Sequence, residues 1–327
     1  MTTLYLKEQG SVLRRVGERL VVTKERERLE DVPIIHVEQV VVMGNIQVTT
    51  PAVALLLQQE VDVVFLSSRG KFRGRLMTTG SRFAQLRHRQ LRLMGDERQT
   101  LAIAQAIIWS KLVNQAYLLQ TLGAQQAARS IQRDAQKARQ ASKVESLRGH
   151  EGAAGARYFA ALRGLIPDAW GFQQRVYHPP TDRVNAMLSL GYTLVLKDAT
   201  AAVQLVGLDP FLGFFHAINY GRPSLVLDLM EPFRPLVDEM VVQIIHEGTI
   251  ERDDFRPPRD GDAAVLLTDK ACTRYFQAYE RQIKRRTVSP STGQRTSYYR
   301  CLELQARQLA QMIMGSRNTF QPLRLGT

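Results

Sequence analysis

The sequence predicts an α+β protein in which a small N-terminal β-rich domain, residues 1–80, precedes a larger all-α C-terminal domain, residues 81–327. Two patterns predict this division. Short β-branched runs broken by glycine fill the first part, whereas apolar residues recur at helical spacing from about residue 82 onwards. A chain of 327 residues is also long enough for two domains. We expect the connector between them at about residues 76–96.

Apolar or alternating runs predict the strands of the first domain. They are Leu4–Leu6, Val12–Val16, Leu20–Val22, Ile34–Met43 and Val61–Leu66. One short helix is expected at Pro51–Gln59, with Thr50 as its N-cap and Pro51 in the first helical position. The basic, glycine-punctuated run Ser67–Arg75 predicts a turn.

Helical periodicity dominates the rest of the chain. Between Leu101 and Leu119, apolar residues keep one face for about five turns, which is typical of an amphipathic or buried helix. Further helices are expected at Ala127–Ala141, Val144–Leu162, Val184–Leu205, Leu236–His246, Lys270–Arg286 and Ser297–Met314.

The composition narrows the functional class. The chain has 44 Lys and Arg against 31 Asp and Glu, a net charge of +13, which favours a polyanionic partner such as nucleic acid or an anionic membrane. A solvated basic surface without a specific partner has the same composition. Its two cysteines, Cys272 and Cys301, form no C-x-x-C pair, which excludes a zinc ribbon or redox motif. No long apolar stretch or signal peptide is recognisable, so we expect a cytoplasmic protein.

Glu151 is the first candidate for chemistry. On a helix over Val144–Leu162 it falls on one stripe with Leu147, Ala154 and Tyr158, which places it on the inner side. A buried carboxylate is costly unless it is paired or binds a metal. Three glycines surround Glu151 in the run GHEGAAGARYF, and close approach of another helix or of a nucleic-acid backbone would explain them. A frayed helix start with Glu151 exposed is the alternative.

The second candidate stretch runs from Pro210 to Pro235. His216 is expected in an apolar helical segment that ends at a turn, after which Ser224 caps a new helix. Asp228 and Glu231 lie three residues apart and share a face of that helix. Imidazole with carboxylates and no thiolate suits Mn²⁺ or Mg²⁺ rather than structural zinc. On these residues alone, a metal ligand and a core histidine both remain open for His216.

Basic residues that can neutralise phosphates without reading sequence form three clusters. The clusters are Arg82, Arg87, Arg89 and Arg92 in the connector; Arg129, Arg133, Lys137 and Arg139 in the following helix; and Lys284, Arg285 and Arg286. Among them we expect six residues to bind DNA: Arg82, Arg87, Arg89, Lys284, Arg285 and Arg286.

Four runs carry a family resemblance: GHEGAAGARYF, DRVNAMLSLGYTLV, GFFHAINYGRPSLVLDLMEPFRP and RTSYYRCLELQARQLAQMI. In order and spacing they resemble the CRISPR-associated adaptation integrase, and the resemblance covers nearly the whole chain. That family pairs an N-terminal β domain with a C-terminal helical domain. Its D-P-x-N-A motif lacks the proline here, where Arg183 follows Asp182, so this turn is expected to differ while no metal ligand is affected.

The resemblance implies that Glu151, His216 and Glu231 hold a catalytic Mg²⁺ or Mn²⁺ and that Asp228 is an accessory catalytic acid. It implies a metal-dependent DNA endonuclease and integrase that inserts captured fragments as new spacers into a CRISPR array by transesterification. The implied partners are double-stranded DNA, a second copy in a homodimer, and a second adaptation protein that bridges two dimers. Two alternatives remain: a repair nuclease that cleaves branched DNA through the same ion, and a catalytically silent DNA-binding scaffold.

Overall fold

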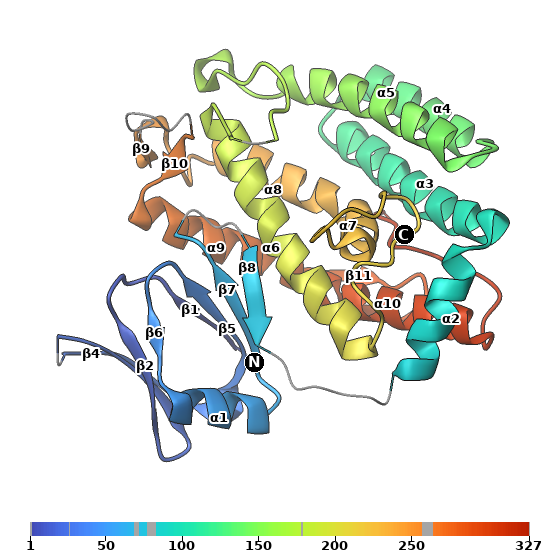
Figure 1. The fold of residues 1–327 in the computed structure, drawn as a ribbon. Coiled ribbons are helices and arrows are strands. Elements are labelled where there is room, and N and C mark those ends of the chain that lie inside the picture. Colours follow the sequence, from blue (N-terminus) through green and yellow to red (C-terminus); the bar gives the residue numbers. More distant parts are fainter. Residues whose placement is uncertain are drawn as a thin grey trace. The chain divides into compact units, whose positions relative to one another are not determined.

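The protein combines sheets and helices in separate parts of the chain (Figure 1). A computed structural model describes residues 2–25, 27–68, 72–76, 83–177, 179–256 and 264–326. The chain divides into two compact units, Met1–Ser81 and Arg82–Thr327. The first carries two sheets and the second is mainly helical, which confirms the predicted α+β class. No helix in the described ranges is long and apolar enough to cross a membrane.

The first unit contains two four-stranded sheets. One has the order β1 (Thr2–Leu6), β5 (Val37–Met43), β7 (Asp62–Leu66) and β8 (Phe72–Leu76), with β8 antiparallel and the others parallel. The other has the order β4 (Glu27–Pro33), β3 (Arg19–Lys24), β2 (Val12–Val16) and β6 (Gln47–Val48). Helix α1 (Thr50–Gln58) precedes β7.

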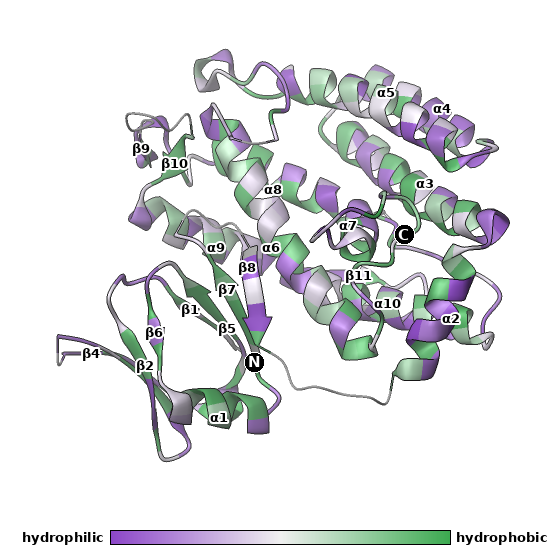
Figure 2. Cartoon of the chain, in the orientation of Figure 1, coloured by the Kyte–Doolittle hydropathy of each residue, from purple (hydrophilic) through white to green (hydrophobic). Residues whose placement is uncertain are grey.

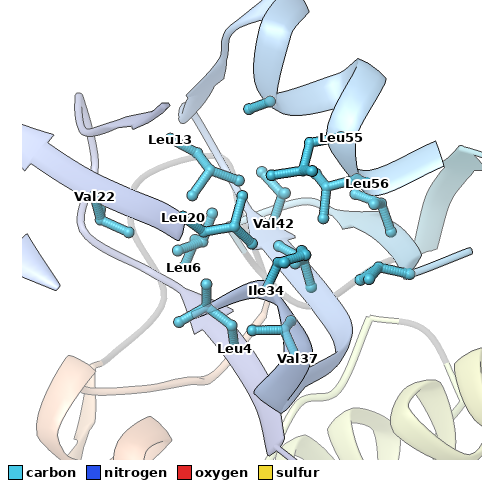
Figure 3. Packing of buried hydrophobic residues seen from close by; sticks show 14 residues of the cluster. Leu4, Leu6, Leu13, Leu20, Val22, Ile34, Val37, Val42, Leu55 and Leu56 are labelled. Atoms are coloured by element: carbon cyan, nitrogen blue, oxygen red, sulfur yellow. The ribbon is translucent and has the colours of Figure 1, made fainter. Parts of the chain in front are cut away.

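Alternating apolar residues of both sheets meet on α1 in one core. Figure 3 shows side chains of strands and helix pointing toward one another, among them Leu6, Leu20 and Leu55. Leu13, Leu20 and Leu56 are fully buried, and burying such a leucine contributes roughly 1.5–3 kcal/mol. The period-2 pattern of each strand therefore specifies which face joins this core.

Several local predictions for the first unit were wrong. Strand β4 was not expected, because its polar sequence ERLEDVP lies at the sheet edge and is held by backbone pairing to β3. The predicted strand from Ile34 begins only at Val37, after a 3₁₀ turn. Helix α1 begins at Thr50 rather than Pro51, and its N-cap is Thr49. The predicted turn Ser67–Arg75 includes residues 72–75 of strand β8, and residues 69–71 of that predicted turn lie outside the described residues.

The second unit follows the predicted helices within a few residues. It contains α2 (Ala84–Met94), α3 (Glu97–Thr121), α4 (Gln125–Arg139), α5 (Val144–Arg163), α6 (Arg183–Val206), α7 (Ser224–Met230), α8 (Arg234–His246), α9 (Asp269–Lys284) and α10 (Tyr298–Met314). It is not purely helical, because two short ribbons, β9–β10 (Phe255–Arg256, Leu266–Leu267) and β11–β12 (Arg286–Val288, Arg295–Ser297), pair through their backbones. Part of the expected connector is helix α2, which packs on α3 and α10.

Helix α3 brings distant parts of the second unit together. It packs on α4 and α5 along one side, as Figure 1 shows, and on the 3₁₀ turn Glu231–Phe233 (η3) between α7 and α8. The helices α5 and η3 carry Glu151 and Glu231, respectively. Hence α3 is the element through which these two acids can meet.

Candidate active site

Glu151 lies in the middle of a continuous helix. Helix α5 buries Leu147, Ala154 and Tyr158 at helical spacing, and Glu151 falls on the same side. Its carboxylate is 24% exposed, which leaves it accessible at the edge of the buried stripe. The alternative of a frayed helix start is therefore wrong.

The glycines around Glu151 do not mediate helix packing. A Cβ added at Gly149, Gly152 or Gly155 would meet no described atom within 4 Å beyond the helix's own neighbouring backbone. The expectation that another helix approaches them is wrong within the described structure. A face without side chains beside Glu151 leaves room for a bulky ligand, so the nucleic-acid explanation stays a prediction.

His216 lies in a loop rather than in the predicted helical segment. The reason is the buried carboxylate of Asp228. Its Oδ2 accepts the backbone N–H groups of Phe214 and Phe215 at 2.6 and 3.0 Å, and its Oδ1 accepts that of His216 at 2.9 Å. Those amides consequently do not bond to helix carbonyls. Glycine is required at position 213, where a Cβ would lie 2.9 Å from Asp228 Oδ2.

Asp228 also orients the imidazole ring. His216 Nδ1 lies 2.7 Å from Asp228 Oδ1. Because an ionised carboxylate only accepts hydrogen bonds, Nδ1 carries the proton in the neutral ring and Nε2 keeps its lone pair. That Nε2 lies 3.8 Å from Glu231 Oε1. The ring therefore presents its free nitrogen toward Glu231.

The turn that carries Glu231 differs from the predicted helix in its details. Ser224 is the first residue of α7 and not its cap, because its hydroxyl donates to Ala217 O at 3.0 Å. Glu231 ends α7 and starts η3, and its side chain is only 3% exposed. Asp228, one turn earlier, is fully buried. The two acids thus face the same region but have different neighbours.

Lys111 on α3 joins the two glutamates. Its Nζ lies 2.5 Å from Glu151 Oε1 and 2.5 Å from Glu231 Oε2. The contact with Glu151 has the alignment of a hydrogen bond, whereas Glu231 Oε2 is a buried acceptor with an ion-pair neighbour and no aligned donor. Glu151 and Glu231 therefore converge on one point, although they come from different helices.

Arg234 provides the second positive charge. Its Nε donates to Glu231 Oε1 at 2.9 Å, and its guanidinium lies 4.6 Å from the ring centre of Tyr192. Burial alone raises the pKa of Glu231, but the charges of Arg234, Lys111 and His216 outweigh it and hold that pKa at about 2. Glu231 is therefore ionised at neutral pH.

The donor set suits a divalent cation. Two carboxylates and the Nε2 atom of an imidazole face the same region, and oxygen and imidazole nitrogen are ligands of Mg²⁺ and Mn²⁺. In this conformation, however, the described residues include no group of three or more His, Cys, Asp or Glu side chains arranged to hold a metal ion. The Lys111 ammonium instead lies between the glutamates. The residues fit an ion only when that ammonium is elsewhere.

Sequence reasoning missed Lys111 and Arg234. Lys111 interrupts a buried face of α3 that includes Ile108 and Leu112, and its side chain is 10% exposed. A lysine on an apolar stripe is a signal that a counter-ion lies opposite. Arg234 follows Glu231 by three residues, which is a pairing distance on a helix. Neither signal identifies the partner across the fold.

Most of the proposed DNA-binding residues bind within the protein. Arg87 Nε donates to Gly207 O at 3.1 Å, and Arg89 Nη1 donates to Met314 O at 2.9 Å. Lys284 pairs with Glu280, Arg285 with Glu239, and Arg286 donates to Arg295 O. Arg82 lies outside the described residues. These contacts are structural, and a DNA contact by any of these residues stays a prediction.

Helix α4 carries a basic stripe of a different kind. Arg129, Arg133 and Lys137 recur every four residues and are all exposed. Within the described structure none of the three has an ion-pair partner. Figure 2 shows hydrophilic residues along α4. This stripe is available to phosphates.

Three comparisons relate the chain to known proteins. A family model described as CRISPR associated protein Cas1 matches residues 4–281. The chain is 34% identical over 322 residues to CRISPR-associated endonuclease Cas1 3 of Thermus thermophilus, covering 98% of this chain and 96% of that protein. A chain of a Cas6-RT-Cas1–Cas2 complex has a TM-score of 0.84 at 26% identity over 100% of this chain and 36% of its own length. A casposase bound to integration product shares the fold, with a TM-score of 0.86 at 22% identity over 98% and 93% of the two chains.

Proposed function

Because the chain belongs to the CRISPR-associated Cas1 family of endonucleases and integrases, we propose that Glu151, His216 and Glu231 hold its catalytic Mg²⁺ or Mn²⁺. The observation that supports this ligand set is the convergence of Glu151 and Glu231 on Lys111 Nζ, 2.5 Å from an oxygen of each. Two acids brought to one buried cation are suited to share an ion of higher charge. Asp228 acts through His216 and is a positioning residue in this proposal.

The surrounding residues prepare the site for phosphodiester transfer. A divalent ion bound here stabilises the charge of the scissile phosphate and of the leaving oxygen. Asp228 holds the imidazole of His216 by its Nδ1 so that Nε2 faces Glu231, and Arg234 keeps Glu231 ionised. Attack by a DNA 3′-hydroxyl forms one P–O bond and breaks another, which inserts a spacer. Attack by water instead cleaves the strand. The position in which the protein holds the DNA ends therefore decides between insertion and cleavage.

The same proposal extends to partners. We expect a homodimer on double-stranded DNA, joined to a second homodimer by a second adaptation protein. The support is the family membership and the similar chain found in a Cas6-RT-Cas1–Cas2 complex. The basic stripe of α4 offers phosphate contacts. We also propose that the two compact units are separate domains that divide near residue 81.

An insertion assay on a supercoiled plasmid with a CRISPR array tests the ligand set. Glu151→Ala should lower insertion and cleavage by at least about 100-fold in Mg²⁺ or Mn²⁺, because a ligand is lost. Glu145→Ala is the matched control, since Glu145 lies on the same helix with its side chain 76% exposed. Circular dichroism and melting temperature check that both variants fold. Wild-type insertion by a folded Glu151→Ala protein would contradict the assignment.

A further inference from the structure

Lys111 lies where the proposed ion would bind. Its side chain comes from the buried face of α3, and its Nζ is 2.5 Å from Glu151 Oε1 and from Glu231 Oε2. Both partners come from other elements, α5 and η3. Lys111 therefore links two helices and one turn through a hydrogen bond and two ion pairs.

The ammonium of Lys111 has two carboxylate partners, Glu151 and Glu231, each with an oxygen 2.5 Å from Nζ. A second cation, the Arg234 guanidinium, donates a hydrogen bond to the other oxygen of Glu231, Oε1. Without the ammonium, Glu151 and Glu231 Oε2 would face each other with no cation between them. Like charges at such a short separation repel, so the two carboxylates would separate.

An ammonium and a divalent ion exclude each other from this position. Metal–oxygen bonds of roughly 2.0–2.6 Å bring an ion as close to the carboxylates as Nζ is now. The two cations would compete for the same oxygen lone pairs and would repel each other. Lysine has a flexible four-carbon stem, so Nζ can withdraw without a shift of α3.

We propose that Lys111 is an internal counter-ion that holds Glu151 and Glu231 together before metal binding and must withdraw when the divalent ion arrives. Lys111 thus opposes ion binding and tunes the metal affinity of the site. The inference rests on the proposed function only through the choice of Glu151 and Glu231 as ligands. In this role Lys111 positions Glu151 and Glu231 and does not need to contact the substrate.

Manganese titration of the full-length protein without DNA tests this role. Lys111→Met keeps the apolar stem and removes the charge. Its dissociation constant for Mn²⁺, measured by electron paramagnetic resonance, should fall by about tenfold, the size of an ordinary coupling between competing ligands. Lys270→Met is the matched control, because Lys270 is exposed on α9, and its affinity should equal that of the wild type. Equal or weaker Mn²⁺ binding by a folded Lys111→Met protein would overturn the inference.

Thermal unfolding separates this role from ordinary packing. Without metal, Lys111→Met should melt below the wild type, and Mn²⁺ should raise its melting temperature by more than it raises that of the wild type. Lys111→Arg should recover the metal-free melting temperature, because it restores the counter-ion, while Mn²⁺ binding stays as weak as in the wild type. A lysine needed only for packing would give a lower melting temperature with no gain in affinity, which contradicts the proposal.

A crystal structure of the wild type with Mn²⁺ covers the case in which Lys111→Met does not fold. Nζ should leave the position between the two carboxylates. Nζ still bound to both Glu151 and Glu231 beside a bound ion would refute the inference. Failure of the proposed function has a different result, namely an active Glu151→Ala protein.

Discussion

Asp228 and Glu231 lie one helical turn apart and have different tasks. Asp228 accepts three backbone N–H groups and the imidazole of His216, all within its own loop and helix. Glu231 faces Lys111 and Arg234 with its two oxygens. The first acid holds the proposed ligand His216 in place, and the second directs its charge toward Lys111 and Arg234.

This difference predicts unequal effects of two isosteric substitutions. Asp228→Asn should slow single-turnover insertion by roughly 10–100-fold, which is the usual cost of losing a group that orients a metal ligand. Glu231→Gln should slow it by roughly 1000-fold or more, because a proposed ligand loses its charge. Equal effects, or a larger effect of Asp228→Asn in a folded protein, would assign Asp228 to the ion instead.

Asp238 on α8, which is not among the proposed ligands, predicts a pH effect on stability. Its carboxylate accepts the hydroxyl groups of Tyr158 and Tyr192 at 2.7 and 2.5 Å. Burial raises the pKa of Asp238 from 3.8 to about 6, against the lowering by these hydrogen bonds and by nearby arginines. The folded protein therefore binds this proton more tightly than the unfolded chain. This tighter proton binding stabilises the folded protein fully below pH 3.8, and the stabilisation is lost as the pH rises through about 6.

Asp238→Asn should remove this pH dependence, since the amide resembles the protonated acid. The melting temperature of the variant minus that of the wild type should increase as the pH rises from about 4 to about 7. Calorimetry in buffers of constant ionic strength measures the difference. A difference that stays constant over this range would mean that Asp238 titrates normally.

At the scale of elements, a C-terminal strap supports the turn that carries Glu231. Asn114 of α3 donates from Nδ2 to Pro232 O at 2.7 Å and to Leu323 O at 3.0 Å, and accepts Leu325 N at 2.8 Å. Gln305 of α10 donates to Leu229 O and accepts Leu323 N. Two buried amide side chains thus link the strap, Leu323–Leu325, to both flanks of Glu231.

Asn114→Ala should destabilise the protein by about 3 kcal/mol, because it leaves buried backbone groups without partners. Urea unfolding measures this loss. Insertion should also slow at temperatures at which the variant stays folded, since η3 loses a support. The control Gln120→Ala, at an exposed position of the same helix, should change stability by less than about 0.5 kcal/mol. Insertion at the wild-type rate in Asn114→Ala would show that the strap only stabilises the fold.

At the scale of the whole molecule, the net charge of +13 should make DNA binding depend steeply on salt. The exposed α4 stripe, Arg129, Arg133 and Lys137, should contribute more than Lys284, Arg285 and Arg286, which have internal partners. Replacing the α4 stripe by glutamine should reduce the slope of log affinity against log salt by about 2.7, or 0.9 per contact on duplex. Replacing Lys284, Arg285 and Arg286 should reduce the slope less. The opposite ranking would place the DNA at the end of α9.

The positions of the long helices were predictable because the responsible signals are local. Apolar periodicity places α3 to α6 within a few residues, and Ser297 caps α10 with its own hydroxyl. The edge strand β4 was not predictable, since its residues are polar and only pairing with β3 makes it a strand. The loop at His216 was missed for the same reason, because a carboxylate 12 residues later takes its amides.

The sequence by itself determined that a β part precedes a helical part and where the long helices lie. It also identified the three residues proposed as ligands. These features depend on periodicity and motifs, which are patterns among residues close together in the sequence. Only the tertiary structure showed that the Lys111 ammonium lies between Glu151 and Glu231. Lys111 meets Glu151 across 40 residues, and it meets Glu231 through the packing of α3 on η3. Charges brought together by packing have no signature in sequence spacing, since their distance depends on how separate helices cross.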